Sequence, residues 1–265
     1  MRWHVVSVGW ALALATAAAA GAGSATEPAP DPGPAIVLEL FTSQGCSSCP
    51  PAERVLNQLG LDEKTRGRVV PLAFHVDYWD AGGWVDPFSA REWTARQLAY
   101  DHALGDGMYT PQLVVNGSVQ FPGGNEPRAL AEIASALASA SLVRVALTAR
   151  KGESGPPALT VKLTAEVTEN VAARKLQVFV ALFESRLTTA VARGENGGRT
   201  LESGYVVRRL ETALSLAPKA GTRKQGSVAF KLDRAWKPEN IGVAAFVQDP
   251  GSMRIYGAAT LQAFD

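Results

Sequence analysis

The sequence has no concentrated positive charge. Its 26 Lys and Arg residues are nearly balanced by 25 Asp and Glu residues, which leaves a formal net charge of +1, and no run of Lys or Arg stands out. Nucleic acids and anionic membrane surfaces are bound through clustered basic residues. We therefore expect no nucleic-acid partner and no polybasic contact with a membrane.

Histidine is rare, and its positions restrict the chemistry that the C-terminal half can carry. The segment 141–265 contains no histidine, so it holds no Ser/His/Asp set, and it shows no metal cluster. His75 lies in an apolar segment, where a hydrogen-bonded core histidine is more common than a catalyst. A zinc site built from Cys46, Cys49, His75 and His102 does not have the spacing of a compact finger. We expect no cofactor and no resident metal.

Long apolar runs are also scarce, apart from the N-terminus. Arg2 is followed by an apolar stretch to about Ala20 and then by small residues, the order of a secretory signal peptide. The stretch is rich in Ala and Gly rather than Leu and Ile, and four prolines follow it, which disfavours a retained membrane anchor. We expect a signal peptide over 1–25, a Pro-rich lead-in over 26–34, no membrane span after cleavage, and a periplasmic or secreted protein.

Cysteine is limited to Cys46 and Cys49. An oxidising compartment allows the two to pair. So short a loop stabilises a fold by only about 2 kcal/mol in the chain-entropy model. A redox role is therefore favoured over a purely structural disulfide.

The segment 35–140 alternates expected buried strands with amphipathic helices. The apolar runs at 35–41 and 72–76 indicate strands covered on both faces. Between them, a helix after Cys49 has one apolar face and Gly60 as its C-terminal cap. Asp86 is expected to cap a second helix that runs towards Leu104.

Two further strands at 112–115 and 118–121 flank Asn116-Gly117, a strong hairpin signal. A helix with Leu130, Ile133 and Leu137 on one stripe completes the predicted order β-α-β-α-β-β-α.

The pattern changes to a period of two from residue 142 onwards. Alternating apolar residues at 143–147, 159–163 and 176–180 and strand-like runs at 227–232, 241–247 and 254–261 are separated by turn-rich segments. This predicts an antiparallel β-sandwich over 141–265, with a domain boundary near residue 141.

The position of the cysteines predicts distinct roles for them. A thiol at a helix N-terminus faces free N–H groups and the positive end of the helix dipole, which favour the thiolate. We expect Cys46 to be exposed and to attack a partner disulfide. Cys49, further into the helix, would then resolve the mixed disulfide by attacking Cys46.

Thr110-Pro111, just before the predicted hairpin, adds a second motif. Together with the cysteine loop it resembles the thioredoxin superfamily, in which a cis-proline precedes the hairpin and presents the preceding backbone to substrate. The resemblance implies an α/β thioredoxin-like domain over 35–140, with Thr110 and Pro111 as substrate-binding residues. The superfamily's buried acid aligns with Leu40. Neighbouring Glu39 is a candidate proton acceptor for Cys49 if the strand register is shifted, or else a carboxylate paired elsewhere.

Four segments resemble one particular family more specifically: 39–51, 75–80, 109–117 and 195–199. In these the chain is similar to a family of secreted bacterial thioredoxin-like proteins of uncharacterised function. Trp79 and Trp84, after the second strand, are expected at the same end of the sheet as the cysteines, where they line a groove or anchor a loop.

The expected function is thiol–disulfide oxidoreductase-like chemistry on the thiols or disulfides of exported proteins, reset by an unidentified redox partner. Two alternatives stay open. One is a binding or assembly module with the cysteine pair as a redox latch. The other is copper(I) handling by the two soft thiolates.

Overall fold

The computed structural model describes residues 1, 3, 35–65, 67–152 and 157–262. The expected signal peptide and Pro-rich lead-in lie, except for residues 1 and 3, outside this part. The described residues from 35 onwards belong to one compact unit. Within the described ranges, no helix is both long and apolar enough to cross a membrane.

The strands and helices of the first half follow one another in the predicted order. They are β1 (Ile36–Thr42), α1 (Cys49–Leu61), β2 (Val69–His75), the short helix η1 (Asp80–Gly82), α2 (Arg91–Leu104), β3 (Gln112–Val115), β4 (Val119–Pro122) and α3 (Glu126–Leu137).

Two predicted helix boundaries are wrong. Helix α1 continues past Gly60 to Leu61, and Asp62 takes the C-cap position. Helix α2 begins at Arg91 with Ala90 as N-cap. The carboxylate of Asp86 accepts hydrogen bonds from elsewhere in the fold, as described below, and does not cap that helix.

The second half consists of strands and one short helix. They are β5 (Val143–Lys151), β6 (Ala158–Val167), β7 (Leu176–Glu184), β8 (Leu187–Ala190), β9 (Thr200–Ser203), β10 (Val206–Leu216), β11 (Arg223–Lys231), η2 (Pro238–Asn240), β12 (Ile241–Gln248) and β13 (Ile255–Gln262). The sequence pattern did not predict β8, β9 or β10.

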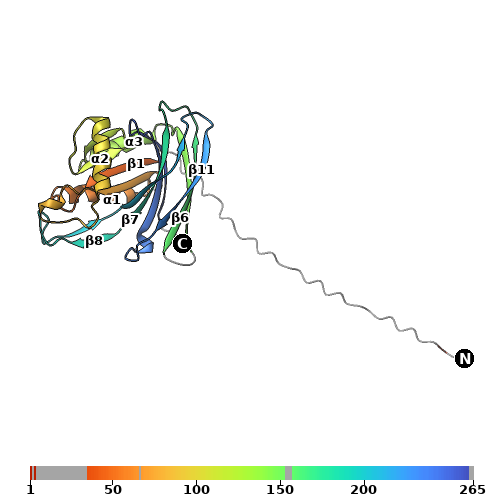
Figure 1. The fold of residues 1–265 in the computed structure, drawn as a ribbon, viewed down its shortest axis with the longest axis horizontal. Helices are drawn as coiled ribbons and strands as arrows, with labels where there is room; N and C mark the ends of the chain where they lie inside the picture. The colour runs from red at the N-terminus through yellow and green to blue at the C-terminus, as the bar shows by residue number, and fades with distance from the viewer. Residues whose placement is uncertain (2, 4–34, 66, 153–156, 263–265) are drawn as a thin grey trace. The chain divides into compact units, whose positions relative to one another are not determined.

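Strand β10 joins the two halves into a single sheet. It pairs with β7 and also lies parallel to β2, where the Ala73 N–H donates to the Tyr205 carbonyl at 2.8 Å. The result is an eight-stranded mixed sheet in the order β13-β12-β7-β10-β2-β1-β3-β4 (Figure 1). The expected fold class, a thioredoxin-like α/β domain followed by a separate β-sandwich, is therefore wrong.

Both faces of this sheet are covered. On one face, α2 packs over an apolar cluster that includes Phe41 of β1, Phe183 of β7 and Phe246 of β12. On the other, α1 and α3 cover β1 to β4, while the three-stranded sheet β11-β6-β5 covers β7 and β12. Figure 1 shows the helices at one end of the molecule and β6 and β11 at the other. One core thus extends across both halves of the chain.

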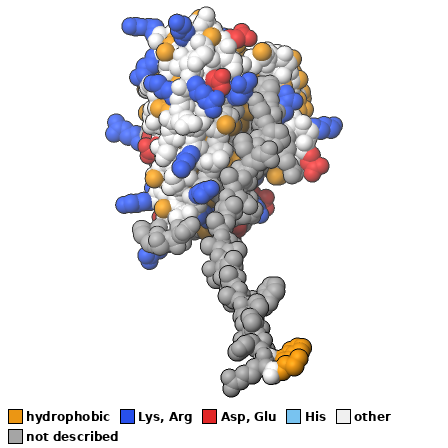
Figure 2. Space-filling model, turned by 90° about the vertical axis from the view of Figure 1, so that its right-hand side faces the viewer, with side chains coloured by type: hydrophobic (Ala, Val, Ile, Leu, Met, Phe, Trp, Pro, Cys, Tyr) orange, Lys and Arg blue, Asp and Glu red, His pale blue; other side chains and the backbone are white. Residues whose placement is uncertain are grey.

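The outer face of the sheet β11-β6-β5 is rich in positive charge. Arg150, Lys162, Arg223 and Lys231 are exposed, and the pairing of the strands turns them to the same side. Figure 2 shows Lys and Arg side chains along this side of the molecule. Strand alternation gathers these charges although the sequence contains no basic run.

Candidate functional site

The two cysteines lie in the loop that connects β1 to α1, here called the cysteine loop (residues 43–49). Cys46 and Cys49 form a disulfide with their Cα atoms 5.4 Å apart. The Cys46 N–H donates to the Ser43 carbonyl, and the Cys49 N–H donates to the Cys46 carbonyl, both at 3.2 Å. Cys49 is the first residue of α1, so the disulfide closes the turn that leads into the helix.

The disulfide is enclosed. Cys46 is 1% exposed and Cys49 is fully buried, whereas Ser47 and Ser48 between them are exposed. The expectation that Cys46 is exposed is therefore wrong for this oxidised state. A reactant needs a change in the surrounding structure to reach either sulfur.

A loop from the second half covers the cysteine loop. It is the segment 191–199 between β8 and β9, here called the cap loop. The Asn196 side-chain amide donates to the carbonyls of Gln44 and Cys46, both at 2.9 Å. The Glu195 carboxylate accepts the Ser47 N–H at 2.9 Å. Three main-chain groups of the cysteine loop are thus bound by two cap-loop side chains.

Asn196 is held in one orientation. It is fully buried, although its neighbours from 192 to 200 are exposed. Arg199 donates to the Asn196 Oδ1 at 2.6 Å, which leaves the amide N–H groups to face the cysteine loop. Neither residue was a predicted site residue, although the segment 195–199 did carry part of the family resemblance.

Two tryptophans also border the cysteine loop. Trp84 donates its indole N–H to the Gln44 side chain at 3.3 Å, and Trp79 donates its own to the Thr110 hydroxyl at 2.7 Å. A Cβ at Gly45 would lie 3.2 Å from Trp79 Cβ, so Trp79 contacts both motifs. The Thr110–Pro111 peptide bond is cis. Trp79 therefore links the cysteine loop to the Thr110-Pro111 motif.

Glu39 faces away from the cysteine helix. Arg96 of α2 donates to both of its carboxylate oxygens, at 2.6 and 2.8 Å, and the Tyr100 hydroxyl donates to one of them at 2.7 Å. Its neighbours on β1, Leu38 and Leu40, face α1 instead. Of the two expectations for Glu39, the carboxylate paired elsewhere describes the structure.

A different carboxylate lies on the cysteine side. Glu53 follows Cys49 by one helical turn on the buried face of α1, and it accepts a hydrogen bond from the Thr42 hydroxyl at 2.9 Å. A sequence signal for it exists: Glu53 interrupts the apolar face formed by Ala52, Val55 and Leu56.

The carboxyl ends of β1 and β2 also carry a buried His75–Asp86 pair. One oxygen of Asp86 contacts His75 Nδ1 at 2.7 Å and accepts the Gln44 N–H at 2.7 Å, so the pair is attached to the cysteine loop. Both side chains are fully buried. In the part of the chain that is described, His75 Nε2 has no hydrogen-bond partner.

The pKa values of these groups are shifted by burial and by one another. Burial, the largest contribution, raises the pKa of Glu53, and the charge of His75 offsets this only in part. Burial acts to lower the pKa of His75, but the charge and hydrogen bond of Asp86 raise it overall. Burial acts to raise the pKa of Asp86, but His75 and the N–H groups of Gln44 and Phe88 lower it overall. The fold therefore strengthens proton binding at His75 and Glu53 and weakens it at Asp86.

Across the ranges described, no three Cys, His, Asp or Glu side chains converge in a way that could hold a metal ion. The site consists of the disulfide, its cap loop and the buried groups beneath it.

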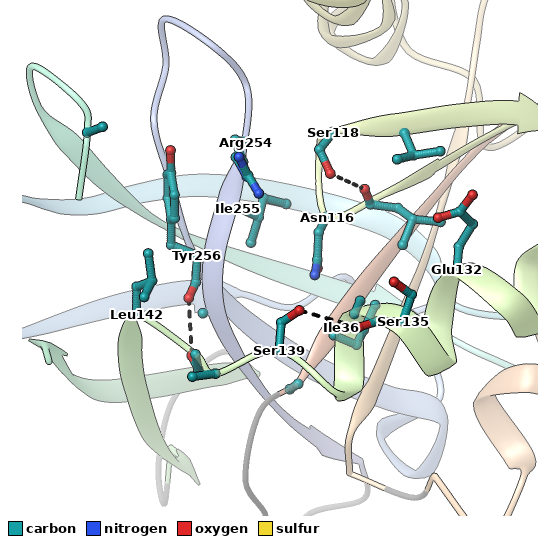
Figure 3. A pocket seen from close by; sticks show the side chains of 18 of the residues that line it. Ile36, Asn116, Ser118, Glu132, Ser135, Ser139, Leu142, Arg254, Ile255 and Tyr256 are labelled. Carbon is teal, nitrogen blue, oxygen red and sulfur yellow. Dashed lines mark hydrogen bonds between the residues drawn. The ribbon is translucent and has the colours of Figure 1, made fainter. Parts of the chain in front are cut away.

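A cavity of about 510 Å³ opens at the opposite end of β1 (Figure 3). Ser135 and Ser139 of the α3 region, Asn116 of the β3–β4 turn and Tyr256 of β13 are among its lining residues. Figure 3 shows polar side chains around its rim and the dashed hydrogen bond from Ser139 back to the Ser135 carbonyl. The lining includes neither cysteine, so the cavity is separate from the disulfide.

Comparisons with known proteins show a family without an assigned activity. Residues 37–248 match the family described as "Protein of unknown function (DUF1223)". A crystal structure of a protein from Agrobacterium tumefaciens is 28% identical with a TM-score of 0.64, and the alignment covers 87% of this chain and 95% of that chain. HBP35 of Porphyromonas gingivalis is 18% identical with a TM-score of 0.64, covering 87% of this chain and 75% of that one, which shows similarity of fold alone. No curated protein matches at a significant level.

Proposed function

The chain belongs to the DUF1223 family of proteins of unknown function, and we propose that it exchanges thiols and disulfides with exported polypeptides through Cys46 and Cys49. The observation that carries the proposal is the disulfide between these residues at the start of α1. A sulfur just before a helix faces unpaired N–H groups, which favour the thiolate needed for exchange. A disulfide that closes so short a loop adds little to the stability of the fold.

The proposed reaction has two steps. In the reduced protein, the Cys46 thiolate attacks one sulfur of a partner disulfide, forms a mixed disulfide and releases the other partner sulfur as a thiolate. Cys49 then attacks the Cys46 sulfur, which reforms the Cys46–Cys49 disulfide and releases the partner's first sulfur. Two electrons pass from the cysteine pair to the partner. The reverse sequence oxidises a partner dithiol.

Glu53 is the group that we assign to the proton of Cys49. When Cys49 becomes a nucleophile, its thiol proton passes to the Glu53 carboxylate, one turn along the same buried helix face. This assignment replaces Glu39, whose oxygens are bound by Arg96 and Tyr100.

Thr110 and Pro111 are proposed to receive the partner backbone, because Trp79 connects them to the cysteine loop. The signal-peptide pattern of residues 1–25 supports a periplasmic or secreted location. A second exported dithiol or disulfide is required to restore the starting redox state after each turnover.

The test uses two serine variants of the full-length protein after export. We expect Cys46→Ser to abolish exchange with a disulfide-bonded polypeptide, and Cys49→Ser to accumulate a mixed disulfide at Cys46, measured by mass spectrometry. Wild-type exchange rates in the Cys46→Ser variant would contradict the proposal.

The burial of both sulfurs favours one second candidate, a redox latch that fixes the cysteine loop without turnover. This candidate predicts that the cysteines stay oxidised in the cell, and that Cys49→Ser traps no polypeptide. Partners captured by Cys49→Ser would exclude it.

A further inference from the structure

The cap loop satisfies main-chain groups of the cysteine loop with side chains that resemble a peptide backbone. The Asn196 amide N–H groups bind the carbonyls of Gln44 and Cys46, as backbone N–H donors would. The Glu195 carboxylate accepts the Ser47 N–H, as a backbone carbonyl would. These three groups belong to Cys46 itself, to the residue after it and to the residue two positions before it.

The cap belongs to a hairpin that is separate from the large sheet. Within the described ranges, β8 and β9 form a two-stranded sheet of their own. The cap loop also contacts one of the two tryptophans that border the cysteine loop, because a Cβ at Gly194 would lie 3.2 Å from Trp84 Cβ. Displacement of the cap loop frees three main-chain groups of the cysteine loop at once.

We propose that Asn196 and Glu195 are specificity-determining residues that restrict exchange at Cys46 to extended polypeptides, which replace the hydrogen bonds of the cap loop with their own backbone groups. The inference rests on the proposed function and names its substrate class. It places the selectivity in the second half of the chain, 149 to 150 residues away from Cys46.

The selectivity follows from the cost of leaving buried polar groups without partners. A small thiol that enters beneath the cap separates Asn196 from two carbonyls and offers no backbone donor in return. An extended polypeptide brings N–H and C=O groups at regular spacing and restores the lost bonds. The small thiol therefore meets a barrier that the polypeptide avoids.

The test compares two thiols on the oxidised protein. One is 2-mercaptoethanol, and the other is an extended peptide with a single cysteine. Either thiolate attacks the Cys46 sulfur, forms a mixed disulfide and releases Cys49 as a thiolate, which is alkylated and counted by mass spectrometry. We expect the wild type to favour the peptide. Asn196→Ala should raise the 2-mercaptoethanol rate about tenfold, as the loss of two hydrogen bonds implies, and change the peptide rate far less.

Glu195→Gln provides a second variant that is expected to fold, because the Glu195 side chain is exposed. It should shift the ratio of the two rates in the same direction by a smaller factor. Glu202→Gln, an exposed carboxylate on β9 of the same hairpin, is the matched control and should leave the ratio unchanged.

The inference is overturned if Asn196→Ala and Glu195→Gln leave the ratio unchanged, including the case in which both rates rise by the same factor. If the proposed function itself is wrong, the result is a different one: the Cys46→Ser variant continues to exchange with polypeptides.

Discussion

Glu39 and Glu53 are both buried carboxylates, but their neighbours give them different properties. The Glu39 carboxylate accepts hydrogen bonds from the Arg96 guanidinium, which also neutralises its charge, and from the Tyr100 hydroxyl. Glu53 has the Thr42 hydroxyl as a neutral partner and shares its surroundings with the charges of His75 and Asp86. Glu39 is therefore a structural ion-pair partner, whereas Glu53 is suited to take up and release a proton near Cys49.

Glu53→Gln should change how stability depends on pH. Because the pKa of Glu53 is raised, the folded state holds this proton more tightly than the unfolded state does. The protonated Glu53 side chain therefore contributes to the stability of the fold. This stabilisation is fully present below the unfolded pKa of 4.5 and is lost as pH rises through the folded pKa. Glutamine does not ionise, so the variant keeps its free energy of unfolding as pH rises while the wild type loses some of its own. The difference in free energy of unfolding should reach about 1.4 kcal/mol for each unit by which the pKa of Glu53 is raised.

Urea denaturation from about pH 4 to about pH 8 measures this difference. Glu202→Gln, whose carboxylate is exposed, controls for the loss of a charge. A difference between Glu53→Gln and wild type that stays flat with pH would show that Glu53 does not hold its proton in the fold.

At the scale of elements, the contact between α1 and the start of β10 explains a glycine inside a helix. A Cβ at Gly60 would lie 2.5 Å from the Tyr205 hydroxyl and 2.7 Å from Pro71. Gly60 is thus required by the close approach of these segments, and it does not end the helix. The approach lies next to the point where β10 pairs with β2, at Val206 and Ala73.

Gly60→Ala should destabilise the protein even though alanine favours helix formation. We expect the overpacking, typically about 1–3 kcal/mol, to outweigh a propensity gain of about 1 kcal/mol. Gly82→Ala is the control, because its Cβ would meet no atom within 4 Å. Urea denaturation of both variants measures the difference in stability. A Gly60→Ala variant more stable than wild type would show that Tyr205 and Pro71 move aside for the added methyl group at little cost.

At the scale of the whole molecule, buried polar groups connect the two halves through the sheet. Arg96 of α2 binds Glu39 of β1 and also donates to the Gln248 side chain of β12 at 3.2 Å. The aromatic rings of Phe74 and Phe246, from the two halves, lie 5.5 and 5.3 Å from the same guanidinium. Folding of one half is therefore expected to depend on the other.

Glu39→Gln should lower the stability of both halves by the same amount, about 3–5 kcal/mol, because it leaves the Arg96 charge buried without its partner. Hydrogen exchange detected by mass spectrometry should show the slow amides of β3–β4 and of β12–β13 losing protection together. Glu166→Gln, which removes a partner from exposed ion pairs on β6, should cost less than about 1 kcal/mol. Loss of protection in the first half alone would contradict a single cooperative sheet.

Local patterns predicted most elements but not how they assemble. The sequence predicts the apolar runs of β1 and β2, the Asn116-Gly117 hairpin, the alternating strands near 159 and 176, and the strand-like run near 241. Strand β10 was missed because residues 206–216 contain good helix formers such as Leu, Arg, Glu and Ala, and only pairing with β7 and β2 makes the segment a strand. The start of α2 was misplaced because Asp86, a good capping residue, is bound instead by His75 and Gln44.

The sequence by itself determined the cysteine pair at the start of a helix and the types of most elements, because these depend on residue spacing over a few turns. The tertiary structure decided the single sheet, the turning of Glu39 towards Arg96, the burial of Cys46 and its contact with Asn196. Each of these depends on hydrogen bonds or packing between distant segments, such as the bond from Asn196 to the Gln44 carbonyl across 152 residues. No local pattern encodes such a contact, because its free energy exists only when the whole sheet brings the two segments together.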